Sequence, residues 1–200
     1  MRLPTRVFLG LLVFALVGCA TEPHREDWLF MNLGATKWKI AQQKQTAAWR
    51  VKELVPEGET LDNWTEQIYW LSFKKGSTSV PPETEVNRSR EFIQAICPGV
   101  VWNVIERKEK VIVYEWRISN CKPGKAELET LAKGRGQFQP DPKVEIEKFT
   151  GDQHVINLYI EGEWTIWRIG YTAKIKELSK EKRAEWIQRF LDAKVETVSR

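Results

Sequence analysis

Cys19 is the residue whose type and setting predict the most definite chemistry in this chain. It directly follows Leu16-Val17-Gly18, at the end of a short apolar run over residues 7–17. A thiol is a nucleophile that a lipid donor can alkylate, and a small residue before it suits cleavage at that bond. The spacing therefore predicts that the chain is cut after Gly18 and that the Cys19 thiol carries a lipid.

Residues 1–18 have the layout of a bacterial lipoprotein signal peptide. Arg2 and Arg6 supply the basic start, and the apolar run is shorter than the roughly 20 residues that a membrane-spanning helix needs. Residues 16–19 fit the lipobox of bacterial lipoproteins; the alternative is an ordinary signal peptide with a chance cysteine. We expect a mature lipoprotein that begins at Cys19 and is held to a membrane by acyl chains such as palmitate.

The residue after the cysteine bears on the destination of the protein. Ala20 follows Cys19, and resemblance to Gram-negative lipoproteins implies sorting to the outer membrane, with the domain facing the periplasm. The chain has 31 basic and 27 acidic residues, so the loss of Arg2 and Arg6 lowers the formal net charge from +4 to +2. This small excess gives little reason to expect a nucleic-acid partner.

Two further cysteines remain in the mature chain. Cys97 precedes Pro98-Gly99, and Cys121 lies just before Pro123-Gly124, at the two ends of a predicted hairpin. An even pair in an exported protein predicts a disulfide, which would stabilise the fold by roughly 3 kcal/mol. The alternative is a catalytic or metal-binding thiol.

No motif in the sequence predicts a catalytic residue, a metal or a cofactor. His24 and His154 have no ligand spacing around them, and the common nucleophile, phosphate-loop and zinc signatures are absent from the sequence. Glu161 and Glu163 flank Gly162 and could form a carboxylate pair, but a solvated hairpin turn is the simpler interpretation.

Tryptophan is abundant, and it is the residue type that most suggests binding. The chain has ten, and Trp102 and Trp164 lie near predicted hairpin ends, where they could form a binding surface. Core packing is the simpler interpretation for most of the others.

The elements that must position these residues follow from apolar periodicity. The pattern predicts an α+β fold, an antiparallel sheet with two main helices packed on it. In strand 111–118, Ile112, Tyr114, Trp116 and Ile118 are predicted to face the core, and Val113, Glu115 and Arg117 mostly the solvent. The expected strands are 47–55, 64–74, 100–105, 111–118, 144–149, 155–160 and 164–171, with a more ambiguous strand at 126–133 and a loop at 134–142. The expected helices begin at caps Thr84 and Ser179, and they end before Pro98 and near Lys194.

The mature chain divides into a lipidated tether over 19–36 and one periplasmic domain over 37–200. The tether contains an apolar cluster at Trp28–Met31. We expect this cluster to dock on the domain, and the alternative is contact with the membrane surface beside the anchor.

Two stretches resemble an uncharacterised family of Gram-negative envelope lipoproteins. Gly58-Glu59-Thr60-Leu61-Asp62-Asn63-Trp64-Thr65-Glu66 fits a Gly-Glu-x-x-x-Asn-Trp-Thr-Glu segment, and the run from Tyr171 to Ala193 is similar to the end of the same group. The resemblance implies an envelope location and supplies no catalytic residues.

We therefore expect a membrane-anchored, non-enzymatic module that binds another envelope component, and we expect this component to be a protein. One alternative is a carrier of a lipid or other apolar ligand, with a cleft under the C-terminal helix. A second alternative is an envelope hydrolase that uses carboxylates distant in sequence.

Overall fold

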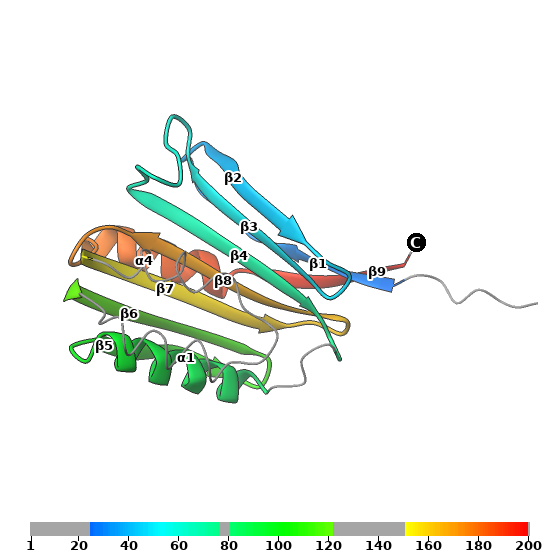
Figure 1. The fold of residues 1–200 in the computed structure, drawn as a ribbon. Helices are drawn as coiled ribbons and strands as arrows, with labels where there is room; N and C mark the ends of the chain where they lie inside the picture. Colours follow the sequence, from blue (N-terminus) through cyan, green and yellow to red (C-terminus); the bar gives the residue numbers. More distant parts are fainter. Residues whose placement is uncertain (1–24, 77–80, 122–150, 200) are drawn as a thin grey trace, which may run out of the picture.

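The computed structural model describes residues 25–76, 81–121 and 151–199, which form one large sheet, a two-stranded ribbon and two helices (Figure 1). The large sheet is antiparallel, with seven strands in the order β2-β3-β4-β8-β7-β6-β5. Its strands are β2 (Trp38–Gln45), β3 (Trp49–Pro56), β4 (Glu66–Lys74), β5 (Val101–Lys108), β6 (Val111–Cys121), β7 (Gly151–Glu161) and β8 (Thr165–Ala173). The ribbon pairs β1 (Arg25–Phe30) with β9 (Lys194–Ser199), and the helices are α1 (Pro82–Ile96) and α4 (Lys180–Leu191).

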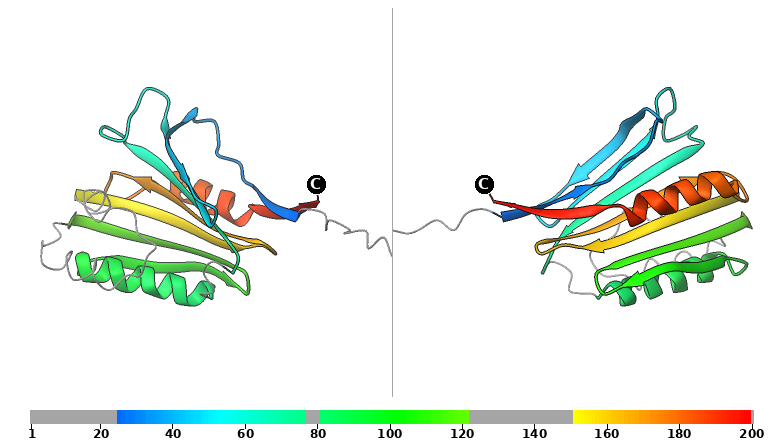
Figure 2. Two further views of the ribbon diagram at one scale, coloured as in Figure 1. Left: turned by 45° about the vertical axis from the view of Figure 1, so that its right-hand side comes forward. Right: turned by 180° about the vertical axis from the view of Figure 1, so that it is seen from behind.

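The centre of the sheet is buried on both faces because β6, β7 and β8 carry apolar residues at odd and even positions. In β7, Ile156 and Leu158 face the side of α4, whereas Val155 and Tyr159 face the side of α1. Figure 2 shows the two helices on opposite faces of the sheet. The described chain therefore has two apolar clusters separated by one layer of strands.

The first helix lies on the face formed by the even-numbered residues of β6. The buried residues of α1 are Val86, Ser89, Ile93 and Ile96, which form one stripe at helical spacing. The three apolar residues among them share a cluster with Tyr114, Trp116 and Ile118 of β6. The predicted cap at Thr84 is wrong. Pro81 is the N-cap and Pro82 the first helical residue, where the missing N–H of proline costs nothing.

The second helix covers the opposite face. Trp186 and Phe190 of α4 are buried against the sheet, and the Trp186 ring stacks on Tyr171 with centroids 4.0 Å apart. The hydroxyl oxygen of Ser179 accepts a hydrogen bond from the Lys182 N–H (3.2 Å), so the predicted cap is confirmed. The prediction that Val113 and Glu115 lie on a mostly solvated face is wrong, because both side chains are buried on this α4 side.

The structure differs from two predictions about the ends of the chain, because both ends of the described chain form the ribbon. Arg25–Phe30 lies inside the predicted tether but forms strand β1, and Leu29 packs against the apolar cluster beneath α4. The last helix ends at Leu191 instead of near Lys194, and Lys194 begins β9. The apolar cluster at Trp28–Met31 is therefore divided, with one side facing the domain and one facing outwards.

The α+β expectation holds in its coarse form: among the described residues the fold is a mainly antiparallel sheet with two helices. Strand β2 was not predicted. The expected elements at 126–133, 134–142 and 144–149 lie outside the described residues, as do the predicted signal peptide over 1–18 and Cys19.

Candidate functional site

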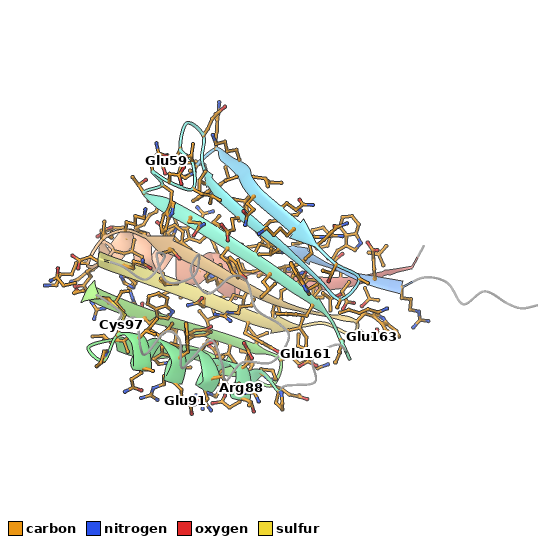
Figure 3. All side chains as sticks on the ribbon, viewed as in Figure 1. Glu59, Arg88, Glu91, Cys97, Glu161 and Glu163 are labelled. Atoms are coloured by element: carbon orange, nitrogen blue, oxygen red, sulfur yellow. A yellow bond between two sulfur atoms is a disulfide. The ribbon has the colours of Figure 1, made fainter. Side chains whose placement is uncertain are left out.

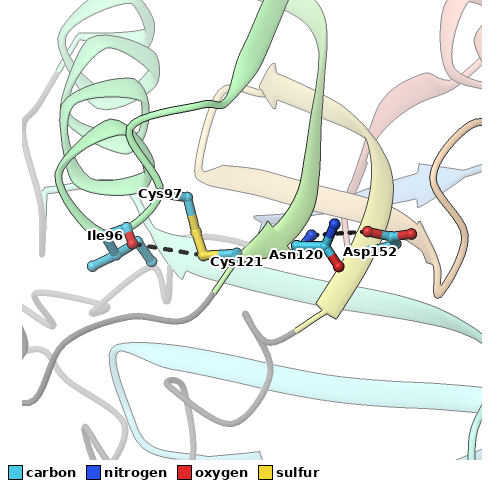
Figure 4. Close-up of a disulfide and its surroundings, with 5 residues drawn as sticks. All are labelled: Ile96, Cys97, Asn120, Cys121 and Asp152. Carbon is cyan, nitrogen blue, oxygen red and sulfur yellow. Dashed lines mark hydrogen bonds between the residues drawn. A yellow bond between two sulfur atoms is a disulfide. The ribbon is translucent and has the colours of Figure 1, made fainter.

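The disulfide between Cys97 and Cys121 joins the end of α1 to the end of β6 (Figure 4). The Cα atoms are 5.6 Å apart, which is a normal separation for such a bond. Cys97 is the C-cap of α1, and its N–H donates to the carbonyl oxygen of Ile93 (2.8 Å). The predicted pairing is therefore present, and it fixes the helix to the strand that it covers.

The residue before Cys121 completes this corner. Asn120 has a φ of 51°, a left-handed conformation that asparagine tolerates better than most residues. Its backbone N–H donates to the Asp152 carboxylate of β7 (2.9 Å). The ladder between β6 and β7 is irregular from Ile118 to Cys121, so this contact holds the two strands together where their regular pairing is interrupted.

A charged network lies on the α4 side of the sheet, and sequence reasoning missed it. Glu115 of β6 accepts two hydrogen bonds from Arg183 of α4, one on each carboxylate oxygen, both at 2.7 Å. His154 of β7 lies 3.2 Å from Oε2 of Glu115, and the Asn103 amide of β5 donates to Oε1 (3.2 Å). Four elements therefore converge on one carboxylate.

The hydrogen bonds of His154 define its tautomer. Its Nδ1 accepts the backbone N–H of Leu178 (3.0 Å), so Nδ1 cannot carry a proton in this arrangement. In the neutral ring the proton is then on Nε2, which donates to Glu115. His154 is almost completely buried, and it links the carboxylate to the segment that leads into α4.

The electrostatics of this network favour a structural role for Glu115 over a catalytic one. Burial raises the pKa of Glu115, but hydrogen bonds from His154, Arg183 and Asn103 outweigh it and hold the pKa well below its ordinary range. A carboxylate with so low a pKa and so many donors is a poor general base at neutral pH. The arrangement can therefore hold β5, β6, β7 and α4 together, and it has no reacting group in place.

A second carboxylate fastens the ribbon to the large sheet. Asp27 of β1 is buried, and its Oδ2 accepts the backbone N–H groups of Trp164 (2.6 Å) and Thr165 (2.8 Å) at the β7–β8 turn. Its Oδ1 accepts the hydroxyl of Thr197 in β9 (2.7 Å). One side chain thus joins both strands of the ribbon to the tip of the central hairpin.

Gly162 makes this close approach possible. A Cβ atom at this position would lie 2.4 Å from Oδ2 of Asp27 and 2.9 Å from a methyl carbon of Val195. Real Cβ contacts are not this short, so any larger residue must displace the carboxylate. The glycine in the predicted hairpin turn is therefore required by the ribbon that packs over it.

Glu161 and Glu163 lie at the same end of the molecule (Figure 3). Glu161 pairs with Lys75 (2.5 Å), whereas Glu163 lies 4.0 Å from Arg25 of β1. Each acid thus has its own cation, and the simpler interpretation of a solvated turn agrees with this arrangement for Glu163, whose side chain is half exposed.

The two tryptophans predicted as a binding surface differ in their surroundings. Trp102 of β5 is half-buried, and its ring stacks on Tyr114 with centroids 4.9 Å apart. Trp164 is 43% exposed at the β7–β8 turn. Trp28 and Phe30 of β1 are also exposed, and β1 lies beside the β7–β8 turn that carries Trp164, because Asp27 accepts the backbone N–H of Trp164. The sequence indicated Trp164 as a candidate binding residue, and Trp28 and Phe30 as part of the apolar cluster at Trp28–Met31.

The segment that carries the family resemblance has a local structural explanation. Glu59 accepts the N–H of Thr65 (2.7 Å) and its hydroxyl (2.6 Å), and the Asn63 side chain accepts the N–H of Thr60 (2.6 Å). Trp64 is buried, and the Lys174 ammonium lies 4.0 Å from its ring centroid. These residues close the loop between β3 and β4, so the segment requires no catalytic role to explain it.

The comparisons and the described residues give no independent indication of function. Comparison with known proteins found no matching family model, no matching curated sequence and no matching solved structure. Within the described ranges, no cluster of three or more histidine, cysteine or acidic side chains could hold a metal ion. None of the described helices is long and apolar enough to cross a membrane.

Proposed function

We propose that this chain is an outer-membrane lipoprotein, anchored through Cys19 and facing the periplasm, that binds another envelope protein as a non-enzymatic accessory module. The observation that carries the proposal is the way the chain enters the domain. Strand β1 begins at Arg25, six residues after Cys19, and Asp27 fastens it to the central hairpin. A rigid attachment directly after a lipid anchor suits a protein that must be held near the membrane.

The buried charges support a binding module over a hydrolase. A hydrolase needs a base or nucleophile with a free reacting face, whereas Glu115 is enclosed by donors from three side chains and His154 has both ring nitrogens engaged. In this proposal, both helices serve to pack against the sheet and stabilise it.

The carrier alternative expects an apolar cleft beneath the C-terminal helix. Trp186 stacks on Tyr171 there, lies 6.2 Å from the Trp38 ring centroid, and is followed by the fully buried Phe190. These contacts pack α4 against the sheet where the alternative expects its cleft. We therefore propose Trp164, beside the Asp27 contact, as the side chain to test for partner binding.

A cross-linked pull-down of the lipidated protein from native membranes tests the proposal. We expect one reproducible envelope protein with the wild type and a several-fold loss of it with Trp164→Ser. Ile175→Ser is the matched control, because Ile175 is also 43% exposed. Recovery of no protein with correctly localised bait, together with lipid in the mass spectrum of the purified domain, would replace the accessory module with the carrier.

A further inference from the structure

The two faces of the β1–β9 ribbon have different surroundings. In the register of the ribbon, Trp28 lies opposite Glu196 and Phe30 opposite Lys194, so these four side chains share one face. Asp27, Leu29 and Val195 belong to the other face, and they contact the hairpin or the apolar cluster beneath α4. The ribbon thus presents Trp28 and Phe30 outwards.

The outward face is apolar enough to require an explanation. Phe30 is 50% exposed and Trp28 42% exposed, and Val198 on the same face is exposed too. Phe30 and Trp28 are two positions apart on one strand, about 7 Å along it. Glu196 and Lys194 on the partner strand place charges of both signs beside these rings. Aromatic rings next to polar groups suit the boundary between headgroups and acyl chains.

The tether limits what this face can reach. Six residue steps separate Cys19 from Arg25, and a fully extended chain covers about 3.5 Å per step, or at most about 21 Å. Strand β1 therefore begins within about 21 Å of the lipidated thiol in the proposed mature protein. A surface this close to an anchor meets the bilayer far more often than it meets a freely diffusing partner.

We propose that the outward face of the β1–β9 ribbon, with Trp28, Phe30 and Val198, docks on the headgroup region of the bilayer that holds Cys19. This inference rests on the proposed lipid anchor and adds an orientation to it. The ribbon lies along the membrane surface, and Asp27 and Leu29 on its other face point towards the domain and away from the bilayer.

A single spin label can test this contact in the full lipidated protein. With Cys19 acylated and Cys97 bonded to Cys121, an introduced cysteine is the only free thiol. Glu196→Cys places the label beside Trp28 and keeps both aromatic residues. Val101→Cys is the control, because Val101 is 52% exposed at the start of edge strand β5. The protein is reconstituted in vesicles of phosphatidylethanolamine and phosphatidylglycerol and probed with a water-soluble nickel relaxant.

Docking predicts that the label at 196 is several-fold less accessible to the nickel complex in vesicles than in the unanchored Cys19→Ser protein, with no such change at 101. Adding Phe30→Glu to the 196 variant should restore its accessibility. Protein that fails to float with the vesicles would overturn the anchor and the docking together. Protein that floats but keeps a water-exposed label at 196, or shows dipolar broadening from a second copy, would overturn the docking alone.

Discussion

Glu115 keeps its charge inside the protein because four donor groups surround it. Burial alone would favour the protonated acid, yet the hydrogen bonds from His154, Arg183 and Asn103 lower its pKa below the ordinary range. The residues come from four parts of the chain, so their meeting depends on the strand order and on the position of α4. This dependence makes the carboxylate a sensitive probe of the fold.

Glu115→Gln should lower the free energy of unfolding by about 2 to 3 kcal/mol, because it leaves the Arg183 cation without its anion. The loss is at the lower end for a buried pair, since the Arg183 side chain is about one-third exposed. Urea denaturation of the disulfide-bonded protein measures it. Glu177→Gln removes the exposed partner of Arg117 and should cost less than about 0.5 kcal/mol. Equal losses of unfolding free energy for the two variants would contradict the structural role assigned to Glu115.

The same carboxylate predicts a pH dependence. Its pKa is lowered in the folded protein, so its contribution to stability is complete above the ordinary value of 4.5 and is lost as the pH falls below that value. The difference in unfolding free energy between wild type and Glu115→Gln should therefore be constant from about pH 7 to 5 and shrink towards about pH 3. A difference that stays unchanged at about pH 3 would show that the carboxylate charge is not its source.

At the scale of elements, the ribbon depends on Asp27. Asp27→Ala leaves two backbone N–H groups and the Thr197 hydroxyl without their acceptor, and we expect a loss of about 1 to 3 kcal/mol with faster amide exchange in β1 and β9. Gly162→Ala should have the same effect, because its Cβ displaces the Asp27 carboxylate. Gly99→Ala, with open space around its Cβ, is the control. If amide exchange became faster by the same factor in β7 and in β1, the substitution would have destabilised the whole fold and not the ribbon alone.

The disulfide is the second link between elements. Cys97 and Cys121 are 24 residues apart, and removing the cross-link should cost about 3 kcal/mol through the entropy of the unfolded chain. The double Cys97→Ala, Cys121→Ala protein and the wild type under reducing conditions should show the same lowered urea midpoint. If reduction left the wild-type midpoint unchanged, the bond would not stabilise the fold.

The strands with strong apolar alternation were predictable, and those at the margins were not. The α1 stripe and the core of β7 follow directly from local periodicity. Strand β2 reads Trp-Lys-Ile-Ala-Gln-Gln-Lys-Gln, a polar edge strand with little alternation, so it carries no comparable signal. The ribbon pairs Arg25 with Ser199, a contact across almost the whole described chain that no local pattern reveals.

The same limit explains the missed charged network. The β6 pattern indicates which residues share a face, but whether that face is wet depends on where α4 packs. Glu115, His154 and Arg183 are far apart in the sequence, and none belongs to a recognisable motif. The one local signal is that Glu115 shares a face with Val113 in a strand of mostly apolar residues.

At the scale of the whole molecule, strand β1, which follows the proposed anchor in the sequence, begins at one end of the sheet, and Cys97 of the disulfide lies at the other (Figures 1 and 3). We propose that the large sheet lies on the side of the ribbon away from the membrane, with its surfaces open to a periplasmic partner. This arrangement depends on the chemistry of Cys19, which lies outside the described residues.

The most direct measurement is therefore the intact mass of the protein purified from membranes of a Gram-negative host. We expect a chain of 182 residues, the 200 of the sequence less the first 18, beginning at Cys19 and carrying diacylglyceryl and acyl groups. Cys19→Ser should abolish the lipid mass and release the protein from the membrane. A chain without acyl mass, or one that begins at another residue, would contradict the lipoprotein assignment.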